Sequence, residues 1–274
     1  MGTWDRTLMP ELTVATFNLH AGIDGWGRSF DVVAACDALD ADVVVFQETW
    51  TPEDGEGLAA LVATSGGYEV HEARLSDALL LEPAAEASSR WGPSRRDPKA
   101  RPLWVGDIRV LKRARASRPG ASAAFGSWGI ALLSRLPVKR VETIELGRLS
   151  RDSPRLRAAL LAEIEVGDLV LTVVGTHLAH FVHGSPILLD MLRRKLPEPT
   201  QPGLLAGDMN FWGPPVSLAL PGWRRAVRAR TYPSWRAHSQ IDHILVTRPV
   251  RVVSGGAVRV GRSDHLPLRA RLLL

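Results

Sequence analysis

Short apolar runs rich in β-branched residues recur along the chain, and most of them stop at a polar residue. The run at 12–17 ends at Asn18 and is typical of a strand. The continuous apolar run at 43–46 ends at Gln47-Glu48 and predicts a strand that is buried on both faces. Further strands are expected at about 129–134, 158–166, 168–176, 203–207, 241–247 and 265–273. We therefore expect strands to supply most of the hydrophobic core.

Helices are expected in only three places. Ser29 or Asp31 can cap a first helix, because small polar side chains accept hydrogen bonds from the first helical turn. Two further helices are expected at 57–65 and 185–194. The chain shows no repeat of fixed period and no interdomain linker, so we expect residues 1–274 to form one α/β or α+β domain with large sheets.

One stretch departs from this pattern. Residues 83–120 are rich in Pro, Gly, Ser and Arg, and we interpret them as a long basic loop or insertion within the domain. Between 90 and 118, ten Arg or Lys residues stand against Asp97 and Asp107, a net charge of +8. A second basic cluster contains no acid and consists of Arg224, Arg225, Arg228, Arg230 and Arg236.

The charge of the whole chain is +5 at pH 7 and its pI is about 10, which favours a polyanionic partner such as nucleic acid. Trp91 and Trp104 lie in the first basic stretch, and Trp223 and Trp235 lie in or beside the second. Arginines interleaved with aromatic residues suit contact with a charged backbone combined with base stacking. The alternative is that the tryptophans are buried and the arginines form a solvated surface, since 30 of the 34 basic residues are Arg, a bias that a GC-rich genome produces.

The composition argues against several classes of protein. No apolar run reaches the roughly 18 residues that a membrane helix requires, so we expect no transmembrane segment. Residues 1–11 contain no apolar signal core, and a cytoplasmic monomer is the default expectation. Cys36 is the only cysteine, which excludes an intrachain disulfide and a thiolate metal cluster, and we expect it to be a buried structural thiol.

The sequence Gly207-Asp208-Met209-Asn210 carries the strongest chemical signal. Because side chains alternate along a strand, Asp208 and Asn210 can face one pocket. Asp208 could orient or deprotonate a water molecule, and Asn210 could donate to a phosphoryl oxygen without adding negative charge. The alternative is an ordinary Asp-x-Asn turn.

Glu48 and Asn18 follow two of the predicted strands. A carboxylate that directly follows a buried run needs a cation or hydrogen bonds. Glu48 is therefore a candidate ligand for Mg²⁺ or Mn²⁺, which prefer carboxylate oxygens. The alternative for Glu48 is a strand-end acid that caps a turn, and Asn18 taken alone is typical of a turn residue.

Three histidines with three-residue spacing follow another predicted strand: His177, His180 and His183. On a helix this spacing could indicate a zinc site. Gly184 and Pro186 disfavour a long helix there, so phosphate contact by His177 is the better interpretation. The alternative is a structural histidine with satisfied hydrogen bonds.

Ser263-Asp264-His265 places a carboxylate beside an imidazole near the C-terminus. Asp264 could bind a metal ion, and His265 could hold or protonate a phosphate oxygen. Asp242 could accept a hydrogen bond from His265 and fix its orientation. Both acids could instead be ordinary turn residues.

The order of these motifs resembles the endonuclease/exonuclease/phosphatase superfamily, which includes DNase I-like nucleases, abasic-site endonucleases, sphingomyelinases and inositol polyphosphate 5-phosphatases. The resemblance extends from about Val14 to Leu268. It rests on seven elements in sequence order: Asn18, Gln47-Glu48, Gly129-Ile-Ala-Leu-Leu-Ser134-Arg135-Leu136-Pro137, Thr176-His177-Leu178, Gly207-Asp208-Met209-Asn210, Gln240-Ile241-Asp242-His243 and Ser263-Asp264-His265. No single motif is specific, but the ordered set is a strong signal.

The resemblance implies a DNase I-like, four-layer α/β-sandwich with two packed, mainly antiparallel β-sheets flanked by helices. It also implies a divalent-metal phosphoesterase. It assigns to the metal Asn18, Glu48 and Asp264, and to catalysis His177, Asp208, Asn210, Asp242 and His265. His177 and His265 would hold the scissile phosphate. Asp208 would activate water beside the phosphate-binding Asn210, and Asp242 would orient His265.

One position departs from part of the family. Abasic-site members usually have a Tyr where this chain has Thr176-His177, which favours the branches that contain a His.

The expected function is Mg²⁺- or Mn²⁺-dependent hydrolysis of a phosphodiester, with nucleic acid as the substrate. The alternative is a phosphatase or phosphodiesterase that acts on a lipid, an inositol phosphate or another small phosphoester. A non-catalytic binding module on the same scaffold is a third possibility, against which the complete polar set argues.

Overall fold

A computed structural model describes residues 9–25, 28–81, 108–110, 123–149 and 156–274. Most of the basic stretch at 83–120 therefore lies outside the described residues, including Trp91 and Trp104. Its described part, Ile108–Val110, forms a short strand, β4.

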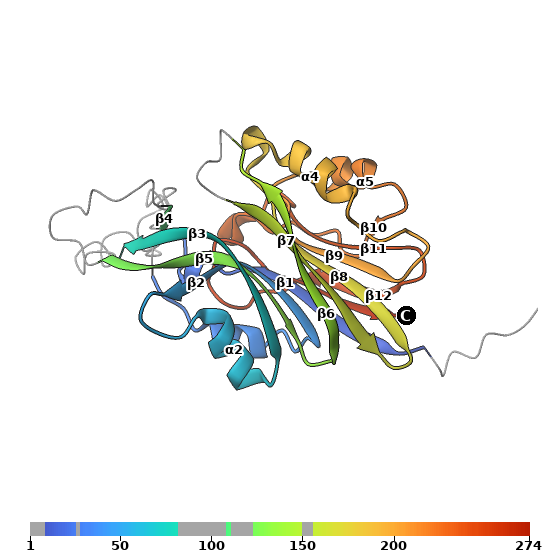
Figure 1. Cartoon of the computed structure of the whole chain (residues 1–274), viewed down its shortest axis with the longest axis horizontal. Coiled ribbons are helices and arrows are strands. Elements are labelled where there is room, and N and C mark those ends of the chain that lie inside the picture. The colour runs from blue at the N-terminus through green and yellow to red at the C-terminus, as the bar shows by residue number, and fades with distance from the viewer. Residues whose placement is uncertain (1–8, 26–27, 82–107, 111–122, 150–155) are drawn as a thin grey trace, which may run out of the picture.

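Two β-sheets form the centre of the molecule (Figure 1). The first has seven strands in the order β12 (Arg251–Ala257), β13 (Leu268–Leu273), β1 (Glu11–Asn18), β2 (Val43–Pro52), β5 (Ala123–Ser134), β3 (Glu69–Leu81) and β4. The second has six strands in the order β10 (Arg224–Arg225), β11 (Asp242–Val246), β9 (Gly203–Asp208), β8 (Leu169–His177), β7 (Arg157–Val166) and β6 (Val138–Gly147). Only the pairs β1–β2 and β8–β9 are parallel among the described strands, so both sheets are mainly antiparallel.

Helices cover the outer face of each sheet. The first sheet is covered by α1 (Val32–Asp37) and α2 (Leu58–Gly66), and the second by α4 (Ser185–Arg193) and α5 (Gly213–Ala219). Figure 1 shows α2 and the pair α4–α5 on opposite sides of the two sheets. Three short 3₁₀ helices complete the described elements: η2 (His20–Gly22), η3 (Phe181–His183) and η4 (Ser234–Arg236). The layers run α, β, β, α, which confirms the predicted four-layer sandwich.

The alternation of side chains along the strands explains these layers. Along β2, Val43 and Val45 belong to the core between the two sheets, whereas Val44 and Phe46 belong to the core under α1 and α2. The run at 43–46 is therefore a strand buried on both faces, as predicted. The second sheet repeats the pattern, because its aliphatic residues divide between the inter-sheet core and a core under α4 and α5.

Two local predictions on the first helix are confirmed. The side chain of Asp31 caps α1 by accepting a hydrogen bond of 2.9 Å from the backbone N–H of Ala34. Cys36 is buried on the same helix, and burial raises the pKa of its thiol to about 11. Such a thiol stays protonated at neutral pH, as expected of a structural cysteine.

In the part of the chain that the structure describes, no helix combines the length and the apolar character needed to cross a membrane.

Candidate active site

The candidate site lies at the rim where β9 ends. His177 pairs with Asp208 in the parallel β8–β9 ladder, and Asp242 pairs with Asp208 in the antiparallel β9–β11 ladder. Strand register alone therefore places the ends of β8 and β9 and the start of β11 side by side. Three of the predicted catalytic residues come together in this way from separate parts of the sequence.

Gly207 allows β8 and β9 to approach closely at this rim. Its φ is 146°, and a Cβ atom at this position would collide with the carbonyl oxygen of Thr176. Any larger residue would push the two strands apart. The glycine before Asp208 thus allows the two strands to lie this close next to Asp208 and His177.

The first sheet contributes Asn18 and Glu48. Asn18 is the last residue of β1, and its Nδ2 donates to Glu48 Oε1 at 3.3 Å. The prediction that a strand ends at Glu48 was wrong, because β2 continues to Pro52. Glu48 instead lies in a β-bulge, where the pairing with β5 shifts register and φ is 53°. The bulge lets a residue within a strand reach Asn18 at the rim.

Residues from both sheets lie around the Oδ2 atom of Asp208. Asn18 Nδ2 donates to it at 3.1 Å, and it lies 3.6 Å from His177 Nε2 and 3.8 Å from His265 Nε2. The other oxygen, Oδ1, accepts a hydrogen bond of 2.8 Å from the backbone N–H of Asn210. One buried carboxylate therefore lies within 3.8 Å of polar groups from its own strand end and from three other segments of the chain.

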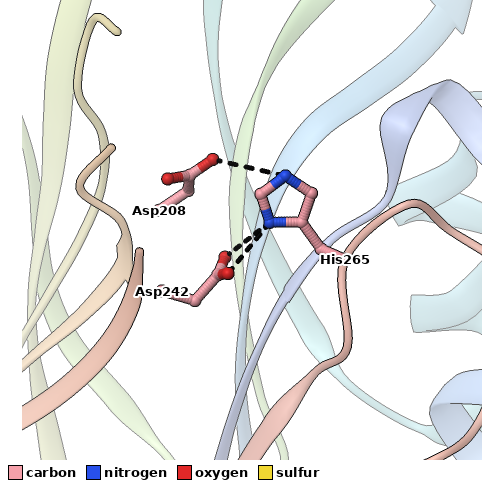
Figure 2. Close-up of side chains that lie close together, drawn as sticks. All are labelled: Asp208, Asp242 and His265. Carbon is pink, nitrogen blue, oxygen red and sulfur yellow. Dashed lines mark hydrogen bonds and ion pairs between the residues drawn. The ribbon is translucent and has the colours of Figure 1, made fainter. Parts of the chain in front are cut away.

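His265 is held by Asp242, as Figure 2 shows. Its Nδ1 lies 2.9 and 3.1 Å from the two carboxylate oxygens of Asp242. An ionised carboxylate only accepts hydrogen bonds, so Nδ1 carries a proton and Nε2 faces Asp208. Ser263 anchors this loop, because its hydroxyl donates to the carbonyl of Asn18 at 2.7 Å and accepts from the His265 N–H at 3.2 Å.

Burial and neighbouring charges shift the pKa values of this pair. Burial, reinforced by the negative charge of Asp242, raises the pKa of Asp208 to about 7. Burial alone would lower the pKa of His265, but the carboxylates of Asp242, Asp264 and Asp208 outweigh it and raise that pKa well above its usual value. These carboxylates therefore favour the protonated form of His265, which lies between Asp242 and Asp208. A carboxylate with a pKa near 7 suits the role of a proton acceptor.

The donor set of the site fits a hard divalent cation. Four carboxylates gather here with three imidazoles: Glu48, Asp208, Asp242 and Asp264 with His20, His177 and His265. The side chains of Glu48 and Asp264 are 20% and 17% exposed, whereas those of Asp208 and Asp242 are 2% exposed. A hydrated ion can therefore reach the two open carboxylates, whose oxygens Mg²⁺ prefers. Asp208, Asp242 and His265 also present ligand atoms within 4.8 Å, but their hydrogen bonds already account for that arrangement.

His20 belongs to the site, although the sequence analysis did not single it out. Its backbone N–H donates to Asn18 Oδ1 at 3.1 Å, and its Nδ1 lies 3.8 Å from Asp264 Oδ1. Burial would lower the pKa of His20, but the charges of Asp264 and Glu48 outweigh it and raise that pKa. His20 therefore lies between Asn18 and Asp264, and the charge of Glu48 also acts on it. Its position two residues after Asn18 was the only available signal.

Two residues that the sequence analysis missed support His177. The ring of Trp128 lies 5.2 Å from that of His177, and buried Arg157 donates to the His177 carbonyl at 3.3 Å. Arg157 also lies over Trp128, 5.3 Å from the ring centroid. The other two histidines of the possible zinc motif, His180 and His183, lie in or beside η3 with rings 5.7 Å apart. Neither belongs to the group of potential metal ligands found among the described residues.

Left-handed backbone conformations concentrate at the site. Among the described residues, five that are not glycine have positive φ, and His20, Glu48 and Asn210 are three of them, with φ of 47°, 53° and 49°. Each such conformation costs of order 1–3 kcal/mol and persists only where the surrounding structure enforces it. Strain of this kind is common at functional sites.

Protonation of His243 at low pH should lower the stability of the folded protein. It follows Asp242 on β11, is fully buried, and its Nε2 lies 2.8 Å from the Phe211 carbonyl. Burial lowers its pKa from 6.5 to about 4, although the Phe211 carbonyl opposes this shift. Between these values the unfolded chain binds more protons than the folded one, so stability rises with pH. This histidine should make the free energy of unfolding about 3 kcal/mol smaller at pH 4 than above pH 7.

Urea unfolding of wild type and His243→Gln over pH 4–8 measures this contribution. The glutamine amide can still donate to Phe211, and every other titrating group is shared by the two proteins. We expect the variant to lose less stability on acidification. Parallel pH profiles for the two proteins would contradict the assignment of a neutral, buried His243.

Comparisons with known proteins agree with this fold. A family model described as the Endonuclease/Exonuclease/phosphatase family matches residues 15–265. No curated protein sequence matches the chain significantly. Among solved structures, the chain is similar to an endonuclease/exonuclease/phosphatase from Beutenbergia cavernae, with 20% identity and a TM-score of 0.66 over 97% of this chain and 72% of that one.

Two further structures share the fold. A humanized D. rerio TDP2 is 15% identical, with a TM-score of 0.59 over 96% of this chain and 98% of that one. A mannosyl-6-phosphatase from Bacteroides thetaiotaomicron is 16% identical, with a TM-score of 0.62 over 96% of this chain and 100% of that one. At these identities the similarity concerns the fold alone.

Proposed function

The chain belongs to the endonuclease/exonuclease/phosphatase family, whose members hydrolyse phosphate esters, and from this we propose that it is a Mg²⁺- or Mn²⁺-dependent phosphodiesterase acting on nucleic acid. The observation that carries the proposal is the convergence of Asn18, His177 and His265 on Oδ2 of Asp208. A carboxylate surrounded by polar hydrogens at one rim of two rigid sheets suits proton transfer beside a bound phosphate.

In the proposed reaction, Asp208 accepts a proton from water. The water oxygen attacks phosphorus in line with the leaving oxygen, so one P–O bond forms as the other breaks. The pKa of Asp208, which burial raises to about 7, lies near the pH at which a general base is most effective. The N–H of Asn210 holds the second carboxylate oxygen and keeps the acceptor in place.

Three side chains would stabilise the charge that develops on the phosphoryl oxygens. His265 would donate from Nε2, because Asp242 holds its other nitrogen. His177 and the Asn210 amide would donate from the other side, where His177 Nε2 and Asn210 Nδ2 lie 3.4 Å apart. Fixed donors of this type act without reorganisation during the reaction.

Glu48, Asn18 and Asp264 would hold the divalent ion. When bound, the ion would neutralise charge on a phosphoryl or leaving oxygen. The Asn18 amide already donates to both Glu48 and Asp208, so it holds the metal-side and water-side carboxylates together. The side chains of Glu48 and Asp264 are partly exposed, so an ion held there would be accessible to solvent and to substrate.

The alternative is hydrolysis of a small phosphoester or a lipid. One structure with the same fold is a mannosyl-6-phosphatase, so mannose 6-phosphate belongs among the test substrates. The test compares duplex DNA, single-stranded DNA, RNA, sphingomyelin, inositol phosphates and mannose 6-phosphate, each with Mg²⁺ or Mn²⁺ and over a range of salt concentrations.

We expect cleavage of nucleic acid with a rate that falls steeply as salt rises, because phosphate contacts release counterions. Cleavage of a small ester with little dependence on salt, and none of nucleic acid, would support the alternative. Hydrolysis that proceeds equally in EDTA would contradict the proposed metal dependence.

A further inference from the structure

Two aromatic side chains that pack together beside the site are exposed to solvent. Trp212 is 51% exposed and Phe181, in η3, is 38% exposed. The centroids of these two rings lie 5.2 Å apart, and the ring of Phe211 stacks on Phe181 at 5.4 Å. Trp212 is thus backed by other aromatic rings while part of its surface stays open, an arrangement suited to stacking on a flat ligand.

Trp212 lies close to the residues proposed to handle phosphate. It follows Asn210 by two residues, which span at most about 7 Å of extended chain. The Asn210 amide donates to the carbonyl of Leu178 at 3.1 Å and lies 3.4 Å from His177. A group stacked on Trp212 would therefore adjoin a phosphate bound at His177 and Asn210.

The chain that follows Trp212 leaves the site and later returns to it. Tyr232 lies beside His265, with ring centroids 4.8 Å apart. Trp235 packs beside Asp264, since a Cβ atom on Gly25 would lie 2.6 Å from the Trp235 ring and 3.6 Å from Asp264 Cβ. The intervening residues thus connect two sides of the site.

This returning chain carries uncompensated positive charge. We call residues 225–236 the arginine segment, after Arg225, Arg228, Arg230 and Arg236. The sequence has no Asp or Glu between 209 and 241, and among the described residues none of these four arginines has an acidic partner within ion-pair distance.

Arg225 connects this charge to the aromatic pair. A Cβ atom on Gly213, the residue after Trp212, would collide with the Arg225 guanidinium. Arg228 follows three residues later in the same segment, and burial and then the positive charge of Arg228 lower the pKa of Arg225. Positive charge therefore begins next to Trp212 and continues along the arginine segment.

We propose that Trp212, backed by Phe181, stacks on an unpaired base of a single-stranded nucleic acid whose phosphates contact the arginine segment. This inference rests on the proposed function and adds the form of its substrate. An exposed ring can stack only on a base whose face is free, whereas duplex DNA presents base edges in its grooves. Several arginines along one segment match the regularly spaced phosphate charges of a nucleic-acid strand, whereas a single lipid headgroup would engage only one or two of these arginines.

Binding measured in EDTA tests this subsite without cleavage. The probe is a fluorescently labelled ten-nucleotide oligo(dT), and the competitors are the matching duplex and vesicles of anionic phospholipid. We expect Trp212→Ala to weaken oligonucleotide binding by about 10- to 100-fold, as loss of one base stack does. Trp212→Phe should restore most of the affinity, because a smaller aromatic ring still stacks.

The double variant Arg228→Gln/Arg230→Gln should lower the slope of log K against log salt by about 0.7 for each lost phosphate contact. Two controls are matched to these variants. Leu218→Ala removes an apolar side chain of α5 that is 82% exposed, and Arg251→Gln removes a charge where β12 pairs with Leu273, at the end of the first sheet remote from Asn18. Both controls should bind like wild type.

The proposal would be overturned if the controls lost as much affinity for oligo(dT) as the test variants. It would also be overturned if the duplex bound more tightly than oligo(dT), or if Trp212 were required for binding to vesicles but not to oligo(dT). Because the assay needs neither metal nor turnover, it separates the two claims. Trp212-dependent oligonucleotide binding by a protein that cleaves no phosphodiester would leave the subsite standing and reject the proposed function.

Discussion

Replacing Asp208 with Asn should lower the turnover of a phosphodiester by about 10³-fold or more, because the variant keeps the shape of the side chain but cannot accept a proton. The Oδ1 atom of the new amide can still accept the hydrogen bond from the Asn210 N–H, so the strand end should keep its conformation. The measurement is the steady-state rate with a saturating phosphodiester. Near-normal turnover by purified Asp208→Asn would contradict the role assigned to this carboxylate.

The same substitution should leave the protein folded, with a melting temperature at pH 8 at least as high as that of wild type. The pKa of Asp208 is about 7 in the folded protein against 3.8 for an ordinary Asp, so its ionisation opposes folding once the pH exceeds 3.8. Removing that charge removes the penalty, which outweighs the loss of the hydrogen bond from Asn18 to Oδ2. Asp190→Asn, on α4, is the matched control, because Asp190 is half exposed and pairs with Arg193 and Arg194. It should keep full turnover.

Removing the divalent ion should abolish activity, and Glu48→Gln should have nearly the same effect. The glutamine can still accept the hydrogen bond from Asn18, but it lacks the charge that binds a hard cation. Any ion that binds only the folded state raises its stability, by about 2.7 kcal/mol when its concentration is 100 times its dissociation constant. Mg²⁺ should therefore raise the melting temperature of wild type but not of Glu48→Gln.

Thermal unfolding with EDTA or with Mg²⁺, followed by activity assays on the same samples, checks this prediction. Glu142→Gln is the control, since Glu142 is exposed on β6 and pairs with Arg140. It should respond to Mg²⁺ like wild type. An equal response in Glu48→Gln, or full activity of the wild type in EDTA, would place the ion elsewhere or exclude it.

The strands that pack on both faces could be predicted from the sequence, whereas the strands at sheet edges could not. Residues 43–46 form a continuous apolar run because one half of them faces each core. Strand β6 is an edge strand, and its Lys139, Arg140 and Glu142 face solvent, so it has no apolar run to detect. Edge strand β12 was missed for the same reason, since all its residues are exposed or half-buried. Strand β3 was missed although it lies inside the first sheet, because the exposed Glu72, Arg74 and Asp77 interrupt its apolar residues.

The candidate site residues could be named from their order in the chain, but their contacts depend on register and backbone strain. The pairing of Asp208 with Asp242 and with His177 follows from strand register, which the sequence does not reveal by itself. Glu48 reaches the site through a β-bulge and a positive φ that glutamate seldom adopts. His20 reaches it through a positive φ that histidine adopts more often than most residues, but its residue type alone does not predict that conformation.

Asp208 and His265, 57 positions apart in the sequence, should act as one catalytic unit. Rates for Asp208→Asn, His265→Asn and the double variant test it directly. When two residues act as a unit, replacing either one removes most of the rate enhancement that they produce together. We therefore expect the double variant to be within about tenfold of the slower single variant. Losses that multiply to about 10⁶-fold would show that the two residues act independently and would contradict the single site described here.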